Sequence, residues 1–270
     1  MILDGKKVSE EILDDIKNKI VERELKLSLA VIYLGNNEAS EIYIRNKEKA
    51  CNKCNIGFKL YHMEKPLESD VIKLINELNE DNNVNGIILQ SPIPDYLDYN
   101  KLSNLISEKK DIDGFTKNNV YHNYLKEKCI LPCTVKGIIR LLDYYHVNLD
   151  GANVVIVGRG EIVGKPLIMS LINRNATVTV CHTHTKNLKS ICNIADILIS
   201  ATGVSHLIKN DYVKDGATVI DVGISRVNGK LSGDVDFDNV KDKCKYITPV
   251  PGGVGPMTVA MIIENIYETM

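Results

Sequence analysis

The chain has 270 residues, of which 44% are hydrophobic and 25% are charged, the balance of an ordinary globular protein. Its 33 basic and 35 acidic residues give a formal net charge of −2, which excludes the basic bias of nucleic-acid-binding proteins. We expect no secretory signal and no membrane partner, because no apolar run reaches the roughly 18 residues of a span, and seven scattered cysteines indicate reduced thiols in the cytoplasm.

The first half alternates short apolar runs with helical patterns. Strands are predicted over residues 29–34 and 86–90, the second of which is stopped by Ser91-Pro92-Ile93-Pro94. Helices are predicted over residues 40–55, with Ser40 as the N-cap, and over residues 71–78 and 102–106.

The second half repeats this alternation more clearly. Strands are predicted over residues 153–157, 176–181, 197–200 and 218–222, and helices over residues 165–173 and 258–267. Strands that alternate with helices form right-handed units and parallel sheets. We therefore expect an α/β fold, with two domains that meet near Leu131-Pro132-Cys133-Thr134.

A glycine-rich turn, Gly158-Arg159-Gly160-Glu161-Ile162-Val163-Gly164, lies between a predicted strand and a predicted helix. Such a turn lets the backbone approach a pyrophosphate, and the helix N-terminus supplies free N–H groups and a positive dipole. The spacing is one residue longer than that of the commonest dinucleotide-binding turn. A tight loop without a ligand is the alternative, because glycine serves many turns.

The segment after the next strand bears on the choice of nucleotide. An NAD site usually places Asp or Glu there to bind the ribose 2′-OH, but Cys181-His182-Thr183-His184-Thr185-Lys186 contains no carboxylate. Arg159 could instead pair with a 2′-phosphate, which favours NADP. The alternative is that Arg159 is a solvated surface residue.

Tyr43 and Lys47 stand four residues apart in a predicted helix, so their side chains share one face. An aromatic ring suits a flat heterocycle, and burial can lower the pKa of a lysine enough for it to move protons. On spacing alone, a helix edge with a snorkelling lysine is the commoner arrangement.

The remaining thiols and imidazoles are interpreted as structural. Cys51 and Cys54 form a CxxC without the second pair that a zinc site needs. His182 and His184 share one side of a strand end but have no further ligands nearby in sequence, so we expect no metal.

Five segments, taken together, carry a more specific signal. They are Ser40-x-x-Tyr43-x-x-x-Lys47, Gln90-Ser91-Pro92-Ile93-Pro94, Lys110-Asp111-Ile112-Asp113-Gly114-Phe115, Gly158 to Pro166, and Pro249-Val250-Pro251-Gly252-Gly253-Val254-Gly255-Pro256-Met257-Thr258. In this order they resemble the bifunctional methylenetetrahydrofolate dehydrogenase/methenyltetrahydrofolate cyclohydrolase family across nearly the full chain. One match could be chance, but all five in order are very specific.

Three positions depart from the family pattern. Gly160 stands where the family commonly has Ser, and Thr183 where many members have Ser near the 2′-phosphate. Val135 follows Cys133-Thr134 where Pro is frequent. The first two bear on the preference for NADP over NAD, and none touches the folate motif.

The resemblance implies an N-terminal α/β folate domain and a Rossmann-type parallel-sheet NADP domain with a cleft between them. The folate-binding catalytic domain would comprise residues 1–132, completed by the C-terminal helix within residues 256–270, and the dinucleotide domain residues 133–255. We also expect helix 258–267 to pack on the N-terminal domain, and cis peptides at Ser91-Pro92 or Val250-Pro251, or both. By resemblance alone we expect a homodimer, through residues 183–188 and 229–235.

The same resemblance implies the roles of the site residues. Tyr43 would stack on the pterin or the linked ring system, and Asp113 would hydrogen-bond the pterin's amino edge. Gln90 would orient Lys47, the candidate general acid/base. The folate would also meet Pro251, Gly252 and Gly253. NADP would be bound by Gly158, Arg159, Gly160, Ile162, Val163, Gly164, Thr183 and Ile224.

The implied activity is oxidation of 5,10-methylenetetrahydrofolate with NADP to the methenyl form, then hydrolysis to 10-formyltetrahydrofolate, in one-carbon metabolism. Hydride transfer needs positioning, whereas hydrolysis needs a general acid/base. Three alternatives stay open: a shikimate-type NADP-dependent dehydrogenase of a small hydroxy or keto acid, a non-catalytic nucleotide sensor, and a family member with dehydrogenase activity alone.

Overall fold

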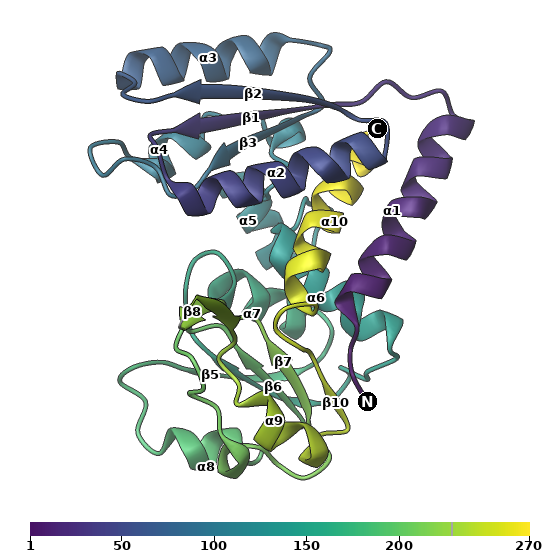
Figure 1. Cartoon of the computed structure of the whole chain (residues 1–270), viewed down its shortest axis with the longest axis vertical. Helices are drawn as coiled ribbons and strands as arrows, with labels where there is room; N and C mark the ends of the chain where they lie inside the picture. Colours follow the sequence, from purple (N-terminus) through teal and green to yellow (C-terminus); the bar gives the residue numbers. More distant parts are fainter. Residues whose placement is uncertain (228) are drawn as a thin grey trace. The chain divides into compact units, whose positions relative to one another are not determined.

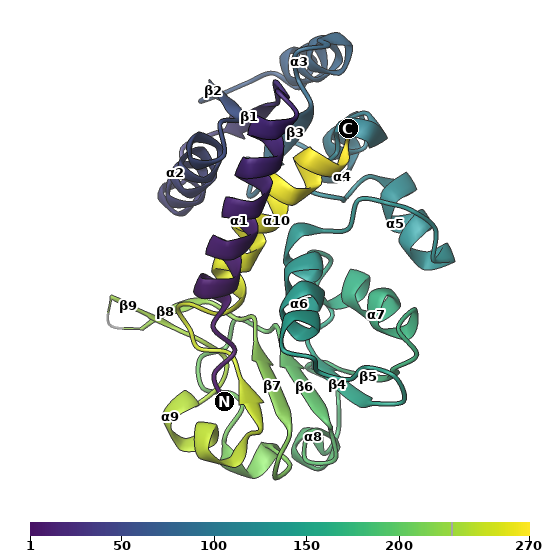
Figure 2. The ribbon, with the colours of Figure 1, turned by 90° about the vertical axis from the view of Figure 1, so that its right-hand side faces the viewer.

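The computed structural model describes residues 1–227 and 229–270 (Figure 1, Figure 2). The chain divides into two compact units, each built on a parallel sheet. The three-strand unit comprises Glu10–Cys133 and Val259–Met270, and the five-strand unit comprises Met1–Ser9 and Thr134–Thr258. The predicted α/β fold with two parallel sheets is confirmed, while the expected cleft stays a prediction.

The sheet of the three-strand unit has the order β2-β1-β3, with all strands parallel. The strands are β1 (Ser28–Leu34), β2 (Gly57–Met63) and β3 (Gly86–Gln90). The helices are most of α1 (Gly5–Glu22), α2 (Glu38–Lys53), α3 (Glu68–Glu80), α4 (Tyr99–Ser103), the 3-10 turn η1 (Glu108–Lys110), α5 (Lys117–Leu125) and most of α10 (Val254–Glu268).

Strand β1 is the centre of this unit because almost all of its residues are buried. Alternate side chains Ala30, Ile32 and Leu34 join one hydrophobic cluster with Val71 and Ile75 of α3. Helices α3 and α2 lie on opposite sides of the sheet in Figure 1, so both faces of β1 are covered. A continuous apolar run, rather than an alternating one, is what such a strand requires.

The sheet of the five-strand unit has the order β10-β7-β6-β4-β5 and is also parallel throughout. Its strands are β4 (Asn153–Val157), β5 (Thr177–Cys181), β6 (Ile197–Ser200), β7 (Thr218–Asp221) and β10 (Tyr246–Ile247), and a separate hairpin pairs β8 (Ser225–Val227) with β9 (Lys230–Ser232). The helical segments are α6 (Cys133–Tyr144), α7 (Gly164–Ile172), α8 (Leu188–Cys192), η2 (Asn210–Tyr212), α9 (Phe237–Val240) and η3 (Lys241–Lys243).

The first nine residues lie in the five-strand unit, whereas the sequence assigned them to the folate domain. Leu3 N–H donates to the carbonyl of Ile247 (2.8 Å), and Lys6 N–H donates to the carbonyl of Gly252 (2.9 Å). These backbone bonds join segments more than 240 residues apart in sequence, which no local pattern can reveal. The chain therefore starts in one unit, and α1 continues into the other.

The C-terminal helix supplies the other long-range connection. Residues 259–270 lie in the three-strand unit, where the sequence analysis placed them. Asn265 of α10 anchors the helix there, because its Nδ2 donates to the carbonyls of Ile112 (2.8 Å) and Leu131 (3.1 Å). The unit boundaries in this part of the chain fall after Cys133 and Thr258.

Two local expectations have clear outcomes. Both Ser91-Pro92 and Val250-Pro251 are cis, which confirms that prediction. Ser40 as the N-cap of α2 is wrong: the helix begins at Glu38, and the side chain of Asn37 accepts the N–H of Ser40. Ser40 sits inside the first turn, where Asn37 satisfies its otherwise free donor. In the part of the chain that the structure describes, no helix is both long and apolar enough to cross a membrane.

Candidate active site

Helix α2 places Tyr43 and Lys47 on one face, one turn apart. The two side chains differ sharply in exposure: Tyr43 keeps 47% of its accessible surface, whereas Lys47 keeps 9%. A lysine that merely lay along a helix edge would keep its ammonium in water. The burial of Lys47 therefore argues against the helix-edge alternative.

The Lys47 ammonium has a specific partner on the neighbouring strand. Its Nζ donates to Gln90 Oε1 at 2.9 Å, and this bond is buried. Gln90 is the last residue of β3, and its own Nε2 donates to the carbonyl of Ser91 at 2.7 Å. Because the amide nitrogen is engaged by Ser91, the amide oxygen is the atom that faces Lys47.

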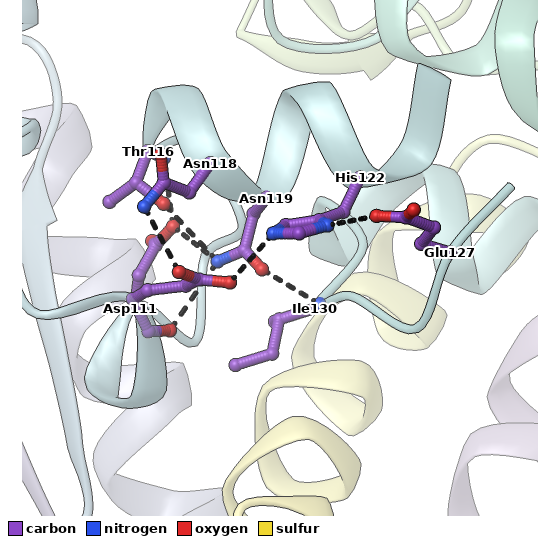
Figure 3. Close-up of polar contacts among 8 residues, drawn as sticks. Asp111, Thr116, Asn118, Asn119, His122, Glu127 and Ile130 are labelled. Atoms are coloured by element: carbon purple, nitrogen blue, oxygen red, sulfur yellow. Dashed lines mark hydrogen bonds and ion pairs between the residues drawn. The ribbon is translucent and has the colours of Figure 1, made fainter. Parts of the chain in front are cut away.

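Asp113 stands on a turn that a second carboxylate builds. Asp111 is buried, and its side chain accepts the N–H of Gly114 (3.0 Å) and of Thr116 (2.8 Å) as well as Asn119 Nδ2 (2.9 Å). Figure 3 shows Thr116 and Asn119, at the start of α5, directed toward Asp111. Asp111 thereby fixes the backbone that carries Asp113.

The same network extends along α5 (Figure 3). Asn119 Oδ1 accepts the N–H of Ile130 (3.0 Å), which ties the segment after the helix back to it. His122 lies between two carboxylates, with Nδ1 2.6 Å from Glu127 and Nε2 3.3 Å from Glu108. Residues 108–130, which include Asp113, therefore form one hydrogen-bonded block.

The electrostatics of Asp113 link it to Lys47. Burial raises the pKa of the half-buried Asp113 carboxyl, while the positive charge of Lys47 acts in the opposite direction. Lys110, three residues earlier, binds the end of α3 instead. Its Nζ donates hydrogen bonds to the carbonyls of Leu78 (2.9 Å), Asn79 (2.7 Å) and Asp81 (2.8 Å). The three-strand unit thus gathers an exposed aromatic ring, a buried amine, an amide and a carboxyl.

In the five-strand unit, the glycine-rich turn connects β4 to α7. Gly158 has a φ of 120°, and a Cβ there would overlap the carbonyl oxygen of Ala201 after β6. A Cβ at Gly164 would come within 2.6 Å of the Gly158 carbonyl oxygen. These two glycines are required by close backbone approach, whereas a Cβ at Gly160 would meet nothing within 4 Å. The departure at Gly160 therefore leaves the path of the turn unchanged.

The other expected cofactor residues lie in this turn or follow other strands of the same sheet. Arg159, Ile162 and Thr183 are exposed, Val163 is half-buried, and Ile224 keeps 43% of its surface. Arg159 also lies within electrostatic reach of His182, whose pKa is lowered by burial and by the arginine's charge. A positive site thus adjoins the end of β5, the place where a Rossmann-type sheet reads the ribose 2′ position.

The segment that carries Pro251, Gly252 and Gly253 also lies in the five-strand unit. Gly252 has a φ of 108°, which favours glycine. A Cβ at Gly5 would overlap the carbonyl oxygen of Gly253, so the start of α1 packs directly on this segment. The seven predicted catalytic and folate residues are thus divided, four in the three-strand unit and three in the five-strand unit.

The structural interpretation of the CxxC agrees with the surroundings of its thiols. Cys51 and Cys54 are both buried and free, and burial raises their pKa values to about 12 and about 11. Among residues 1–227 and 229–270, no group of three or more His, Cys, Asp or Glu side chains is arranged to hold a metal ion. Reactive thiols need a lowered pKa, so this pair is chemically quiet.

Comparison with known proteins places this arrangement in a family. A model described as the catalytic domain of tetrahydrofolate dehydrogenase/cyclohydrolase matches residues 3–113, and one described as the NAD(P)-binding domain of the same enzymes matches residues 132–270. The chain belongs to the tetrahydrofolate dehydrogenase/cyclohydrolase family. The hydroxy-acid dehydrogenase alternative is not supported by this membership.

Individual members of the family match over nearly the full length. The bifunctional protein FolD of Clostridium novyi (strain NT) is 48% identical over 271 residues, which cover 98% of both chains. The structure of the bifunctional enzyme FolD from Campylobacter jejuni superposes with a TM-score of 0.98 at 43% identity, covering 100% of this chain and 98% of that one. The Trypanosoma brucei dehydrogenase-cyclohydrolase, solved with NADP and an inhibitor, superposes with a TM-score of 0.94 at 33% identity and covers 100% and 96%.

Sequence reasoning missed the supporting residues of this family site. Lys110 and Asp111 were recognised as parts of a motif, but their roles as a carbonyl clamp and a turn builder were not. Asn265 was overlooked because a single polar residue in an apolar helix gives a weak signal. Its complete burial among backbone carbonyls is visible only in the folded chain.

Proposed function

We propose that this chain oxidises 5,10-methylenetetrahydrofolate to 5,10-methenyltetrahydrofolate with NADP and then hydrolyses the product to 10-formyltetrahydrofolate, in one-carbon metabolism. Membership of the bifunctional family over nearly the whole chain supports both activities. The observation that carries the proposal is the buried Lys47 amine held by Gln90. Dehydrogenation alone does not require such a group, whereas hydrolysis does.

For hydride transfer, the residues of the three-strand unit act by binding and orienting the folate. Tyr43 offers an exposed ring on which the pterin or the linked ring system stacks, and Asp113 accepts from the amino edge of the pterin. Pro251, Gly252 and Gly253 are further proposed folate contacts. A bound NADP supplies the nicotinamide that takes the hydride. Positioning of this kind can lower a barrier without any proton transfer.

For hydrolysis, Lys47 is the proposed general acid/base. Water that attacks the methenyl carbon must lose a proton, and the ring nitrogen released by the opening must gain one. The hydrogen bond from Lys47 to Gln90 Oε1 fixes the orientation of the amine. The other positions around Nζ therefore point away from Gln90. We assign Gln90 the role of orienting Lys47 rather than of reacting.

The cofactor would be held by the turn between β4 and α7 and by the residues around it. Gly158 and Gly164 permit the close backbone approach on which such a turn depends, because a Cβ at either position would overlap the protein backbone. Gly160, Ile162 and Val163 complete the turn, Thr183 follows β5, and Ile224 follows β7. Arg159 supplies a positive charge for the 2′-phosphate, which supports NADP over NAD.

One assay tests the function as a whole. Purified protein is mixed with methylenetetrahydrofolate and NADP, and methenyltetrahydrofolate is followed by its near-ultraviolet absorbance together with the reduction of NADP. Transient methenyl absorbance followed by its enzyme-dependent loss supports both activities. A stable methenyl signal would leave a dehydrogenase alone, and NADP binding without turnover would leave a nucleotide sensor.

We further propose that the enzyme is a cytoplasmic homodimer that acts on tetrahydrofolate derivatives. Strand β5 ends its sheet, with residues 183–188 directly after it, so this edge is available for pairing. The other candidate segment, residues 229–235, includes Leu231, which keeps 44% of its surface. Light scattering at micromolar concentration tests the dimer, and a monomer mass would count against it.

A further inference from the structure

Two buried aspartates without an assigned role lie at the carboxyl ends of β6 and β7. Asp221, the last residue of β7, accepts the N–H of Asp234 on Oδ1 and that of Val235 on Oδ2, both at 2.9 Å. Asp234 accepts three donors on Oδ2: the Ser200 hydroxyl (2.8 Å), the Thr202 N–H (2.6 Å) and the Thr202 hydroxyl (2.9 Å). The two aspartates keep only 3% and 1% of their surface.

The two carboxylates are accommodated by glycines in a reciprocal arrangement. A Cβ at Gly223 would overlap the carboxyl group of Asp234, and a Cβ at Gly233 would overlap that of Asp221. The segments Asp221-Val222-Gly223 and Gly233-Asp234-Val235 therefore interlock, each glycine making room for the carboxylate of the other segment. Neither glycine has a positive φ, so space rather than backbone conformation is the reason for its small side chain.

Asp234 is not arranged as a purely stabilising group. Its Oδ1 is buried and has no hydrogen-bond partner among the described residues. An unpartnered buried carboxylate oxygen weakens a folded protein. The neighbouring carboxylate adds to this cost, and burial raises the pKa of Asp221 to about 7. An arrangement that costs stability and is still built so tightly points to a role in the site.

The place of the pair in the sheet indicates which role. Strand β5 lies on one side of β4 and β6 on the other, so the strand order reverses between them. In such a sheet the ribose 2′ position is read after the strand in the place of β5, and the pyrophosphate lies at the turn after β4. The positions in the sheet that remain for the nicotinamide half of the cofactor are the ends of β6 and β7. Thr202 follows β6, and Gly223 follows β7.

We propose that Asp234 is a positioning residue for the nicotinamide half of NADP, acting through Thr202 and Gly223. Its carboxylate fixes the Thr202 backbone and hydroxyl, and that hydroxyl in turn accepts the N–H of Val204 at 3.2 Å. On the other side it sets the position of Gly223, next to Ile224. The inference rests on the proposed binding of NADP and extends it to residues that do not touch the cofactor.

The test is direct binding, measured by calorimetry on the full chain with two ligands. NADP carries both halves of the cofactor, and adenosine 2′,5′-bisphosphate lacks the nicotinamide half. Asp234→Asn should weaken NADP by about tenfold, equivalent to about 1.4 kcal/mol, and the bisphosphate by less than about twofold. Thr202→Val, which removes only the hydroxyl, should shift NADP in the same direction by less. Thr202→Ser keeps the hydroxyl and should rescue binding.

The outcomes separate this inference from the function on which it rests. Wild-type protein that binds neither ligand would overturn both. Suppose instead that wild type binds both ligands. If Asp234→Asn and Thr202→Val then bind both ligands as tightly as wild type, or lose affinity for both equally, the positioning role is overturned while NADP binding stands. Should Asp234→Asn fail to fold, the comparison of Thr202→Val with Thr202→Ser decides alone, and equal NADP affinities in that pair would end the proposal.

Discussion

Replacing Lys47 by Met tests the division of labour between the two reactions. Methionine keeps the length and the apolar stem but removes the amine, and with it the buried bond of 2.9 Å to Gln90 Oε1. That oxygen, on a residue with 7% exposure, loses its charged donor, which costs about 1–3 kcal/mol of the free energy of unfolding. Domains are commonly stable by about 5–15 kcal/mol, so we expect the variant to fold.

The two activities should respond unequally. Positioned acid/base groups contribute about 10²–10⁴-fold, so cyclohydrolase activity should fall by that factor and become unmeasurable in an ordinary assay. Hydride transfer has no proton to move, and a substantial dehydrogenase rate should remain. Methenyltetrahydrofolate should therefore accumulate, visible as a lasting near-ultraviolet absorbance during NADP reduction.

Two matched variants sharpen this experiment. Lys49→Met makes the same change at an exposed position of α2 and should leave both activities near those of wild type. Lys47→Arg keeps a positive charge that is not titrated in proteins, so it should not restore hydrolysis. Recovery of cyclohydrolase activity in Lys47→Arg would refute the acid/base role. Parallel loss of both activities in a folded Lys47→Met protein that still binds folate would assign Lys47 to substrate positioning instead.

Three other substitutions probe the cofactor turn and the buried carboxylates. Arg159→Ala should weaken NADP by about 1.5–3 kcal/mol and NAD hardly at all, by calorimetry, because only NADP has a 2′-phosphate to lose; equal losses would mean that Arg159 shapes the turn. Asp111→Asn should lower the free energy of unfolding in urea by about 1–3 kcal/mol, because an amide cannot accept all its donors, whereas the exposed Asn118→Ala should change it little; equal effects would contradict the turn-building role. Because burial raises the pKa of Asp221 to about 7, above about 3.9 in an unfolded chain, the folded state holds an extra proton between these values. The free energy of unfolding should therefore fall as pH rises from about 4 to 7, by at most about 1.4 kcal/mol per pH unit, and Asp221→Asn should remove that slope; an identical slope in the variant would show that other groups cause it.

Features that depend only on neighbours along the chain could be predicted from the sequence. Buried parallel strands need unbroken apolar runs, which is why residues 29–34 and 153–157 were recognisable as β1 and β4. The turn at Gly158 stands out because a backbone that passes so close to the end of another strand tolerates no side chain. Spacing also placed Tyr43 and Lys47 on one helical face.

Whether those residues become a site depends on tertiary contacts. The pattern of α2 fits a surface lysine and a buried one equally well, and only β3, 43 residues later, supplies Gln90 and removes the ammonium from water. No sequence pattern indicated that Met1–Ser9 belongs with the five-strand unit, or that Asp221 and Asp234 interlock through each other's glycines. Such contacts join segments that are distant in the chain, and their partners are set by packing and by the need to satisfy buried polar groups, neither of which leaves a local pattern.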